Sequence, residues 1–358
     1  MDSGGLLHHV AGTGQPASGF TTAGEGGPAT AAGVAWTRDM ADDGDGNLYL
    51  MSDAQIRKVD SQGTIRTVAG GGSASDEDAD GMVATEVQVV PRGIAADSSG
   101  KLYFSDGLVI SAQTPRSHIY SIETDATLKL IAGNGTSVSS GDGGPATQAG
   151  LNRPAPLVFG PTNDLYIATK AAIRRVSAGG GVISTFSDAI AILGGLSVDA
   201  LGNLVTISQF GKRVIALDAS GREAATLAGS ETLSGFSGDG DSASLARVNR
   251  PEGPVVAPDG SIYFSNSENR RIRVIRPDGR INTAAGGDIG DGKPATEAFV
   301  SGKDLALDAD GNLLIADWDR HRVRRVDTSS GTITTAAGTG ELLRRCRVWA
   351  SGHGCRSG

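Results

Sequence analysis

Cysteine and aromatic side chains are scarce in this sequence. Only Cys346 and Cys355 are present among 358 residues, and aromatic residues make up 4% of the chain. Both cysteines lie near the C-terminus, so they cannot cross-link the rest of the chain, and their spacing is not that of a zinc site. Packing alone is therefore expected to hold the fold together.

A long hydrophobic run and an excess of positive charge are also missing. No stretch of 18 or more apolar residues occurs, which argues against a membrane-spanning helix. The formal net charge of −8 argues against a general nucleic-acid binder, which normally presents a basic domain or stripe. Residues Met1–Val10 lack the basic and apolar segments of a secretion signal. A cytoplasmic location is the default expectation, and an extracellular one if a leader or a larger chain precedes these residues.

Glycine, by contrast, is abundant, with 53 residues, and short motifs recur along the chain. The clearest is a strand ending of the Val-Ala-Gly type. Its central residues, or their equivalents, are at positions 11, 69, 132, 186, 228, 285 and 337. The mean interval of about 54 residues is close to that of repeats that form propeller blades.

Each interval contains the same series of segments. A Gly-rich loop such as Gly141–Thr147 precedes an apolar run that ends in Asp, then a second run, and then a third in which apolar residues alternate with Arg. Examples of the three runs are Leu305–Asp308, Gly311–Ile315 and Arg322–Val326. Short runs that are rich in β-branched residues and bounded by Gly, Asp or Asn are typical of strands. Asp-Ala-Asp-Gly-Asn at 308–312 is typical of a hairpin turn.

Four short strands in each of six repeats predict a β-propeller. The succession Gly-Asp-Gly-Gly-Pro-Ala-Thr, Asp-x-x-Gly-Asn-Leu-Tyr, Arg-x-Arg-Val and Val-Ala-Gly-Thr-Gly resembles that of bacterial NHL-repeat proteins, over residues 6–340. The resemblance implies an all-β, six-bladed propeller of NHL-type repeats with four antiparallel strands per blade. It implies less about activity, because NHL propellers include binding domains, kinase sensor modules and a few lyases. We predict the propeller over residues 1–340 and an irregular tail over 341–358.

The two ends of the repeat region leave alternatives open. There are six sets of the first three strands but seven fourth-strand endings, so either Leu6–Ala11 or the segment 331–337 completes the last blade. The tail at 341–358 follows Gly-Thr-Gly where another Gly-rich loop is expected. It fits either a truncated or frameshifted repeat or an ordinary disordered extension.

Arginines of the third run could be mistaken for a phosphate-binding patch. Both faces of a propeller blade pack against neighbouring blades, however, so these arginines are expected to be paired. Acidic residues often end the second run, as at Asp53, Asp106 and Asp317. We expect ion pairs such as Asp317 with Arg322 or Arg324. The Gly-rich loops lack the Lys-Ser/Thr of a P-loop and are predicted to be connectors between blades.

No catalytic, metal-binding or cofactor-binding motif is recognised. The segments 43–47 and 308–312 resemble fragments of a calcium loop but lack its remaining ligands, which favours hairpin turns. NHL-like lyases use histidines that converge on the central channel, whereas the innermost strands expected here contain none. The histidines are His8, His9, His118, His321 and His353. Only Asp304, Glu252 and Arg92 are evident candidates for a site at the channel.

Strand direction predicts where a ligand binds. Alternating strands bring the fourth-to-first connectors and the second-to-third loops to one end of the ring, and function usually lies on long loops over a rigid scaffold. We predict a binding scaffold that recognises a protein, peptide or glycan at this end. The candidate ligand-binding residues are Asn269, Arg270, Trp318, Arg320 and His321. The alternative is a propeller lyase or hydrolase with its site at the central channel; ligand identity and oligomeric state stay open.

Overall fold

The structure is a computed structural model, and it describes most of the chain. The described residues are 11, 24–34, 37–52, 54–74, 79–107, 117–178, 181–188, 195–208, 212–286, 293–298, 300–308, 310–317 and 322–337.

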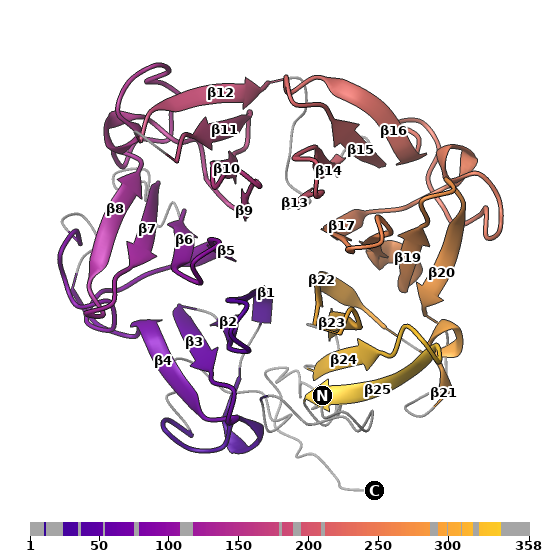
Figure 1. Ribbon diagram of the computed structural model, residues 1–358, viewed down its shortest axis with the longest axis horizontal. Coiled ribbons are helices and arrows are strands. Elements are labelled where there is room, and N and C mark those ends of the chain that lie inside the picture. The colour runs from indigo at the N-terminus through magenta and orange to yellow at the C-terminus, as the bar shows by residue number, and fades with distance from the viewer. Residues whose placement is uncertain are drawn as a thin grey trace, which may run out of the picture.

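Six antiparallel sheets are arranged around a central axis, each with its first strand innermost (Figure 1). Blade 1 consists of β1 (Thr37–Asp42), β2 (Leu48–Ser52), β3 (Gln55–Val59) and β4 (Ile65–Gly70). Blade 2 consists of β5 (Pro91–Ala96), β6 (Leu102–Asp106), β7 (His118–Ile122) and β8 (Leu128–Ala132). Blade 3 consists of β9 (Leu157–Phe159), β10 (Leu165–Ala168), β11 (Ile173–Val176) and β12 (Ile183–Ser187).

The second half of the ring repeats this plan. Blade 4 consists of β13 (Leu196–Val198), β14 (Leu204–Ser208), β15 (Arg213–Leu217) and β16 (Glu223–Gly229). Blade 5 consists of β17 (Pro251–Val256), β18 (Ile262–Asn266), β19 (Arg271–Ile275) and β20 (Ile281–Ala285). Blade 6 consists of β22 (Gly302–Leu307), β23 (Leu313–Asp317), β24 (Arg322–Val326) and β25 (Thr332–Ala337), with the short β21 (Lys293–Pro294) on its outer edge. The predicted six-bladed, all-β fold is confirmed.

The strand β25 is the fourth strand of blade 6. It pairs with β24 through Val326–Ile333 and neighbouring residues, and β21 covers its other edge. Of the competing segment Leu6–Ala11, only Ala11 lies within the described residues. An apolar cluster that joins Met40 and Leu50 of blade 1 to Leu314 of blade 6 seals the ring.

Hairpins at one end of the ring contain five or six residues, as at 97–101 and 177–182. The Asp97 carboxylate accepts hydrogen bonds from the backbone N–H groups of Ser99 (2.9 Å) and Lys101 (3.1 Å). Asp308 does the same for residues 310 and 312. These aspartates therefore stabilise hairpin turns, as predicted. We call the end of the ring that carries these hairpins the short-turn end.

Longer connectors leave the fourth strands at the opposite, loop-rich end. Within them lie short 3-10 turns, which put pairs of alanines against the adjacent blade. Ala146 and Ala149, for example, are 1% and 0% exposed. The 3-10 turns are η1 (Ala29–Ala31), η2 (Ala146–Gln148), η3 (Ala243–Leu245), η4 (Ser267–Asn269, in a hairpin) and η5 (Ala295–Glu297). In the described part of the chain, no helix has the length and apolar character needed to cross a membrane.

Connectors also cover the outer edges of the blades. The Gly143 N–H donates to the Ile183 carbonyl (2.8 Å), and the Gly240 N–H donates to the Ile281 carbonyl (2.8 Å). The Gly-rich loop thus runs along the fourth strand of the blade that follows it in the chain. Covering an edge strand in this way removes a template for unwanted pairing. The prediction that these loops connect blades is confirmed.

The third-strand arginines are buried and paired, but mostly with a different acid from the one expected. Arg273 is completely buried, and its guanidinium lies 2.7 Å from Asp239 of the Gly-rich loop. Arg174 pairs in the same way with Asp142. Arg57 pairs with Glu25 at 3.3 Å.

Blade 6 is where the expected pairing is seen. Arg324 lies 4.0 Å from the buried Asp317. The end-of-strand acid has a second role as well, because Asp317 accepts from the Ser301 N–H at 2.9 Å and Asp106 accepts from the Val90 N–H at 3.1 Å. These acids therefore also hold the chain as it enters an inner strand. Asp53 lies outside the described residues.

We call each pair of loop acid and buried third-strand arginine an arginine latch. The acid of a latch also binds the fourth strand: Asp142 accepts from the Thr185 N–H at 3.1 Å, and Glu25 accepts from the Thr67 N–H at 2.7 Å. Each latch therefore fastens a connector at the loop-rich end to the third and fourth strands of a blade, which fixes the connector in place.

Candidate functional site

Two of the five predicted ligand-binding residues lie in the described structure. Asn269 belongs to η4 between β18 and β19, and its side-chain amide donates to the Gly235 carbonyl (2.7 Å) and to Asn266 (3.0 Å). Its amide thus fastens the hairpin to the neighbouring connector. Arg270 follows in a left-handed conformation and is exposed. Trp318, Arg320 and His321 lie outside the described residues.

Irregular pairing marks the starts of the inner strands of blades 1, 2, 5 and 6, which lie at the loop-rich end. The register shifts between Thr37 and Asp39 in β1 and between Gly302 and Leu305 in β22. Similar shifts occur in β5 and β17. Bulges re-aim side chains and are frequent beside functional sites.

The bulges of β1 and β22 bring Asp39 and Asp304 together beside the axis, where these two strands are neighbours (Figure 1). The two carboxyl groups hydrogen-bond to each other. Asp39 also accepts from the N–H groups of Ile94 in blade 2 (2.8 Å) and Met40 (2.9 Å). This carboxyl pair therefore joins blades 6, 1 and 2.

Burial shifts the protonation of the carboxyl pair. Desolvation raises the pKa of Asp39 to about 6, although its backbone hydrogen bonds oppose the shift. Desolvation and the neighbouring Asp39 charge raise the pKa of Asp304 well above its usual value. Neighbouring carboxyl groups with raised pKa values hold protons to higher pH than isolated carboxyl groups do. One protonated acid beside one carboxylate is an arrangement that can serve acid–base chemistry.

The sequence pointed to Asp304 but not to Asp39. Asp39 lies shortly before an acidic turn, a context in the sequence that is typical of a surface residue. An overlay of the inner strands supplies the missing signal, because Thr37-Arg-Asp-Met in β1 corresponds to Gly302-Lys-Asp-Leu in β22. In blades 2 and 5 the same position is Gly93 and Gly253, respectively. A Cβ on Gly93 would lie 2.2 Å from the Ala155 carbonyl oxygen, and a Cβ on Gly253 would lie 3.0 Å from the Asp304 carboxyl group.

The second channel candidate, Glu252 of β17, is paired within the protein. Its carboxylate is buried and lies 3.1 Å from Arg250. Arg250 also contacts Glu268 of the β18–β19 hairpin at 3.2 Å. Arg250 thus lies between two glutamates, and Glu252 stabilises the start of blade 5.

The third candidate, Arg92 of β5, lines a cavity of about 140 Å³ between blades 2 and 3. Arg153 and Lys170 are also among its lining residues, and the others are apolar or glycine, namely Gly107, Pro154 and Ala155. We call this cavity the basic pocket. It lies at the loop-rich end, where the chain enters β9 and where β10 turns into β11. Its wall contains no acidic residue among those described.

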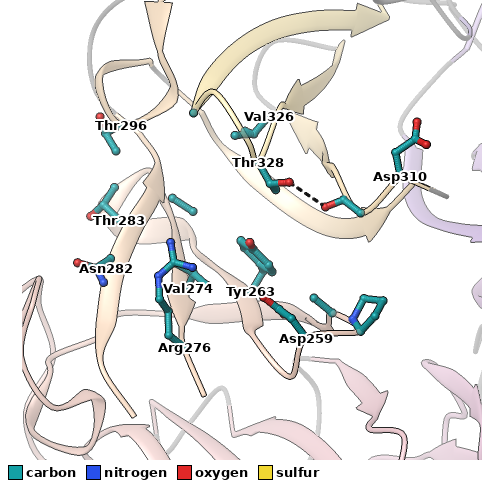
Figure 2. A pocket seen from close by; sticks show the side chains of 15 residues that line it. Asp259, Tyr263, Val274, Arg276, Asn282, Thr283, Thr296, Asp310, Val326 and Thr328 are labelled. Carbon is teal, nitrogen blue, oxygen red and sulfur yellow. Dashed lines mark hydrogen bonds between the residues drawn. The ribbon is translucent and has the colours of Figure 1, made fainter. Parts of the chain in front are cut away.

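A larger cavity of about 600 Å³ opens between blades 5 and 6 at the short-turn end (Figure 2). Tyr263 and Arg276 of blade 5 face Thr328 of blade 6 and the turn that contains Asp310. Most of its labelled side chains are polar. The sequence did not indicate this cavity, because the five-residue hairpins of blades 5 and 6 look like those of the other blades.

The tyrosine at this cavity differs from its counterparts in blades 1 and 2. The Tyr103 hydroxyl donates to Asp97 at 3.1 Å, and the Tyr49 hydroxyl lies 3.3 Å from Asp43. Blade 5 has Ala257 at the corresponding turn position, so Tyr263 lacks that partner. Replacement of one aspartate therefore makes this junction unlike those of blades 1 and 2.

Other groups that could support catalysis are dispersed. His118 is buried in β7 beside Tyr120, away from the innermost strands. Among the described residues, no three His, Cys, Asp or Glu side chains gather closely enough to hold a metal ion. Two features at the starts of the inner strands therefore remain as candidate sites. They are the carboxyl pair of blades 1 and 6 and the basic pocket between blades 2 and 3.

Comparison with known proteins places the chain among propellers without assigning it to a family. No family model matches the sequence. A 28% identical stretch of 272 residues, 67% of this chain, is shared with Protein SUPPRESSOR OF QUENCHING 1 of Arabidopsis thaliana, and a 24% identical stretch of 358 residues, 94% of this chain, with human Teneurin-1. The chain spans only 25% and 12% of the length of these two relatives.

Solved structures share the fold at low identity. An auxiliary nutrient binding protein from Bacteroides ovatus superposes with a TM-score of 0.65 at 15% identity, over 92% of this chain and 76% of that one. A virginiamycin B lyase from Staphylococcus aureus superposes with a TM-score of 0.53 at 13% identity, over 85% and 84%. A gluconolactonase from Xanthomonas campestris gives 0.53 at 13% identity, over 80% and 84%. These likenesses establish the six-bladed propeller fold, which binding proteins and enzymes share.

Proposed function

We propose that the chain is an NHL-type propeller that serves as a binding scaffold, with a protein, peptide or glycan ligand at its loop-rich end. The propeller domain of this proposal comprises residues 1–340, followed by the tail at 341–358. The observation that supports it best is the difference between the two ends. Hairpins of five or six residues form one end, whereas connectors such as 133–156 and 230–250 form the other.

Anchoring of the connectors supports the same proposal. The latch acids Asp142 and Asp239 fasten two connectors to the blades, and Asn269 fastens a hairpin to the connector at Gly235. Loops that are held in one conformation lose less entropy when they bind a ligand. The fold neighbour from Bacteroides ovatus that binds nutrients is consistent with a binding role.

Two exposed arginines of blade 5 allow a matched test. Arg270 lies at the loop-rich end, and Arg276 lies at the short-turn end, where it lines the larger cavity. The labelled full chain is applied to a glycan array and a peptide array, and the strongest ligand is titrated against Arg270→Glu and Arg276→Glu. We expect Arg270→Glu to weaken binding about tenfold or more and Arg276→Glu to leave it within about twofold. The reverse order, or no ligand on either array, overturns the proposal.

A second candidate function is acid–base catalysis at the axis. The observation that favours it is the carboxyl pair, in which burial and the proximity of the two groups raise the pKa of both Asp39 and Asp304. Two fold neighbours are a lyase and a gluconolactonase. Incubation with a panel of simple lactones in a pH-stat tests this function. Activity that is lost in Asp304→Asn and that follows an apparent pKa near 6 supports it, and an unchanged rate in that variant rules out the pair as the catalytic group.

A further inference from the structure

One sequence motif occurs at the entry to two inner strands. Asn152-Arg-Pro154 precedes β9 in blade 3, and Asn249-Arg-Pro251 begins β17 in blade 5. The arginine of each copy has a left-handed backbone with φ of 52°. This conformation is uncommon for a residue other than glycine, asparagine or aspartate, so both turns place arginine at the same unusual position.

The two turns also contact corresponding hairpins. In blade 3 the Lys170 N–H donates to the Asn152 carbonyl at 2.8 Å, and in blade 5 the Ser267 N–H donates to the Arg250 carbonyl at 3.2 Å. The hairpin between the second and third strands therefore lies against the arginine turn in both blades. Side chains of these hairpins are well placed to meet the arginine.

What meets the arginine differs between the blades. In blade 5, Arg250 contacts Glu252, two residues later, and Glu268 of the hairpin. In blade 3 the residue two positions after Arg153 is Ala155, and the hairpin supplies Lys170. Two acids in blade 5 are thus replaced by an apolar residue and a cation in blade 3.

The replacement creates the basic pocket. Arg153 and Lys170 are both exposed and share the cavity of about 140 Å³ with Arg92 of blade 2. Two of its lining residues are closely packed, since a Cβ on Gly107 would lie 2.5 Å from the Pro154 carbonyl oxygen. The positive charges of Arg153 and Lys170 repel each other, and an anion bound near both removes that repulsion. Guanidinium and ammonium groups together are the usual partners of carboxylates and phosphates.

We propose that the basic pocket binds a single oxyanion, the carboxylate or phosphate group of a ligand that docks on the loop-rich end. The small cavity admits one compact anionic group, while the rest of the ligand extends over the neighbouring connectors. The identity of the ligand as a whole rests on the proposed binding function, but the oxyanion site itself does not. Blade 5 has no corresponding site because Glu252 and Glu268 already neutralise Arg250.

Titration with simple anions tests the pocket. Inorganic phosphate and, separately, acetate are titrated into the full chain by calorimetry at constant ionic strength, with sodium chloride as the reference. We expect saturable binding of at least one anion with a Kd of about 1 mM. The anion with the higher affinity, phosphate or acetate, identifies the preferred head group. Absence of saturable binding by both overturns the proposal.

Variants assign the binding to blade 3. Arg153→Gln and Lys170→Gln are each expected to weaken anion binding about tenfold, and the double variant Ala155→Glu, Lys170→Glu, which installs blade-5 acids, is expected to abolish it. Arg250→Gln is the matched control and is expected to leave binding unchanged. Equal weakening by Arg250→Gln and Arg153→Gln contradicts the assignment. Because Arg153 is exposed, its variant is expected to fold, which circular dichroism checks.

The two proposals fail separately. An array ligand whose affinity is unaffected by Arg153→Gln removes the oxyanion site but leaves the binding scaffold standing. Saturable phosphate or acetate binding in a chain that binds nothing on the arrays supports the pocket and removes the broader binding function.

Discussion

Blades 3 and 5 follow the same plan in most details but treat a corresponding arginine in opposite ways. Both have an arginine latch in which a loop aspartate binds a fully buried third-strand arginine, and both enter the inner strand through an Asn-Arg-Pro turn. Blade 5 surrounds Arg250 with glutamates, whereas blade 3 leaves Arg153 beside Lys170. The difference teaches that neighbouring acids, rather than the turn itself, decide whether an arginine stabilises the fold or faces a ligand.

A similar contrast exists among the inner strands. Blades 2 and 5 have Gly93 and Gly253 at the position where blades 1 and 6 have Asp39 and Asp304. Glycine there lets neighbouring backbones approach closely, while the two aspartates place a polar pair at the junction that closes the ring. One position of the repeat thus serves close backbone packing in some blades and holds the carboxyl pair in others.

The largest effect is expected from breaking a latch in either blade. Asp142→Asn and Asp239→Asn each leave a buried guanidinium without its counter-charge, and we expect a loss of about 2–4 kcal/mol in the free energy of unfolding. The carboxylates are partly exposed, which keeps the loss below that of a fully enclosed pair. Urea denaturation measures it.

Asp80→Asn in blade 2 is the matched control for the latches. Asp80 accepts from the Leu130 N–H at 2.7 Å, as a latch acid does with its fourth strand, but the third strand of blade 2 has Tyr120 in place of the buried arginine. Only about 1 kcal/mol is expected to be lost. An equal loss in all three variants contradicts the role given to the buried arginines.

The next effect concerns the carboxyl pair and depends on pH. Because the pKa of Asp39 is raised to about 6 in the folded chain, the folded state binds more protons than the unfolded state above the ordinary pKa of 3.8. Stability therefore falls as pH rises from about 4 through 6, by about 1–3 kcal/mol for this group. The raised pKa of Asp304 acts in the same direction.

Asp39→Asn tests this dependence. Thermal melts between pH 4 and 8 are expected to show the wild type losing stability relative to the variant as pH rises. Parallel curves for the two proteins mean that Asp39 does not have a raised pKa.

A smaller effect is expected from Glu252→Gln in blade 5. The Glu252 side chain is 5% exposed, and its loss leaves Arg250 with the exposed Glu268 alone. We expect a loss of about 1–2 kcal/mol in unfolding free energy, measured by urea denaturation. The converse change in blade 3, Ala155→Glu, adds an acid beside two cations and is expected to leave stability unchanged or slightly raised. A destabilisation by Ala155→Glu as large as that by Glu252→Gln shows that the two turns are not equivalent.

The smallest effect is expected from Arg153→Gln. An exposed arginine that faces other cations contributes little to folding, so the free energy of unfolding is expected to change by less than about 0.5 kcal/mol. Denaturation in buffer free of phosphate and carboxylate measures this. A loss comparable to that of Glu252→Gln indicates that Arg153 has a structural role.

Much of the fold could be predicted because it repeats. The strand runs, the hairpin aspartates such as Asp97 and the Gly-rich connectors each recur, so each copy corroborates the others. The closing strand could not be chosen, because the endings at 11 and 337 look alike in the sequence; only the pairing of β25 with β24 distinguishes them.

The site was less predictable for a physical reason. Asp39 and Asp304 meet only because the ring brings its first and last blades together, and no local pattern reports that contact. The latch partners were partly misassigned, although Glu25, Asp142 and Asp239 occupy one motif position that an overlay could have matched to the buried arginines. The basic pocket was missed because it depends on the absence of two glutamates.

Anomalous diffraction from crystals soaked in selenate tests the contrast between blades 3 and 5 most directly. Selenate is an oxyanion of phosphate-like shape whose position is visible without assumptions about its contacts. We expect an anomalous peak in the basic pocket beside Arg153 and Lys170, and none at Arg250. No peak in the basic pocket, or peaks of equal height at both arginine turns, would contradict it.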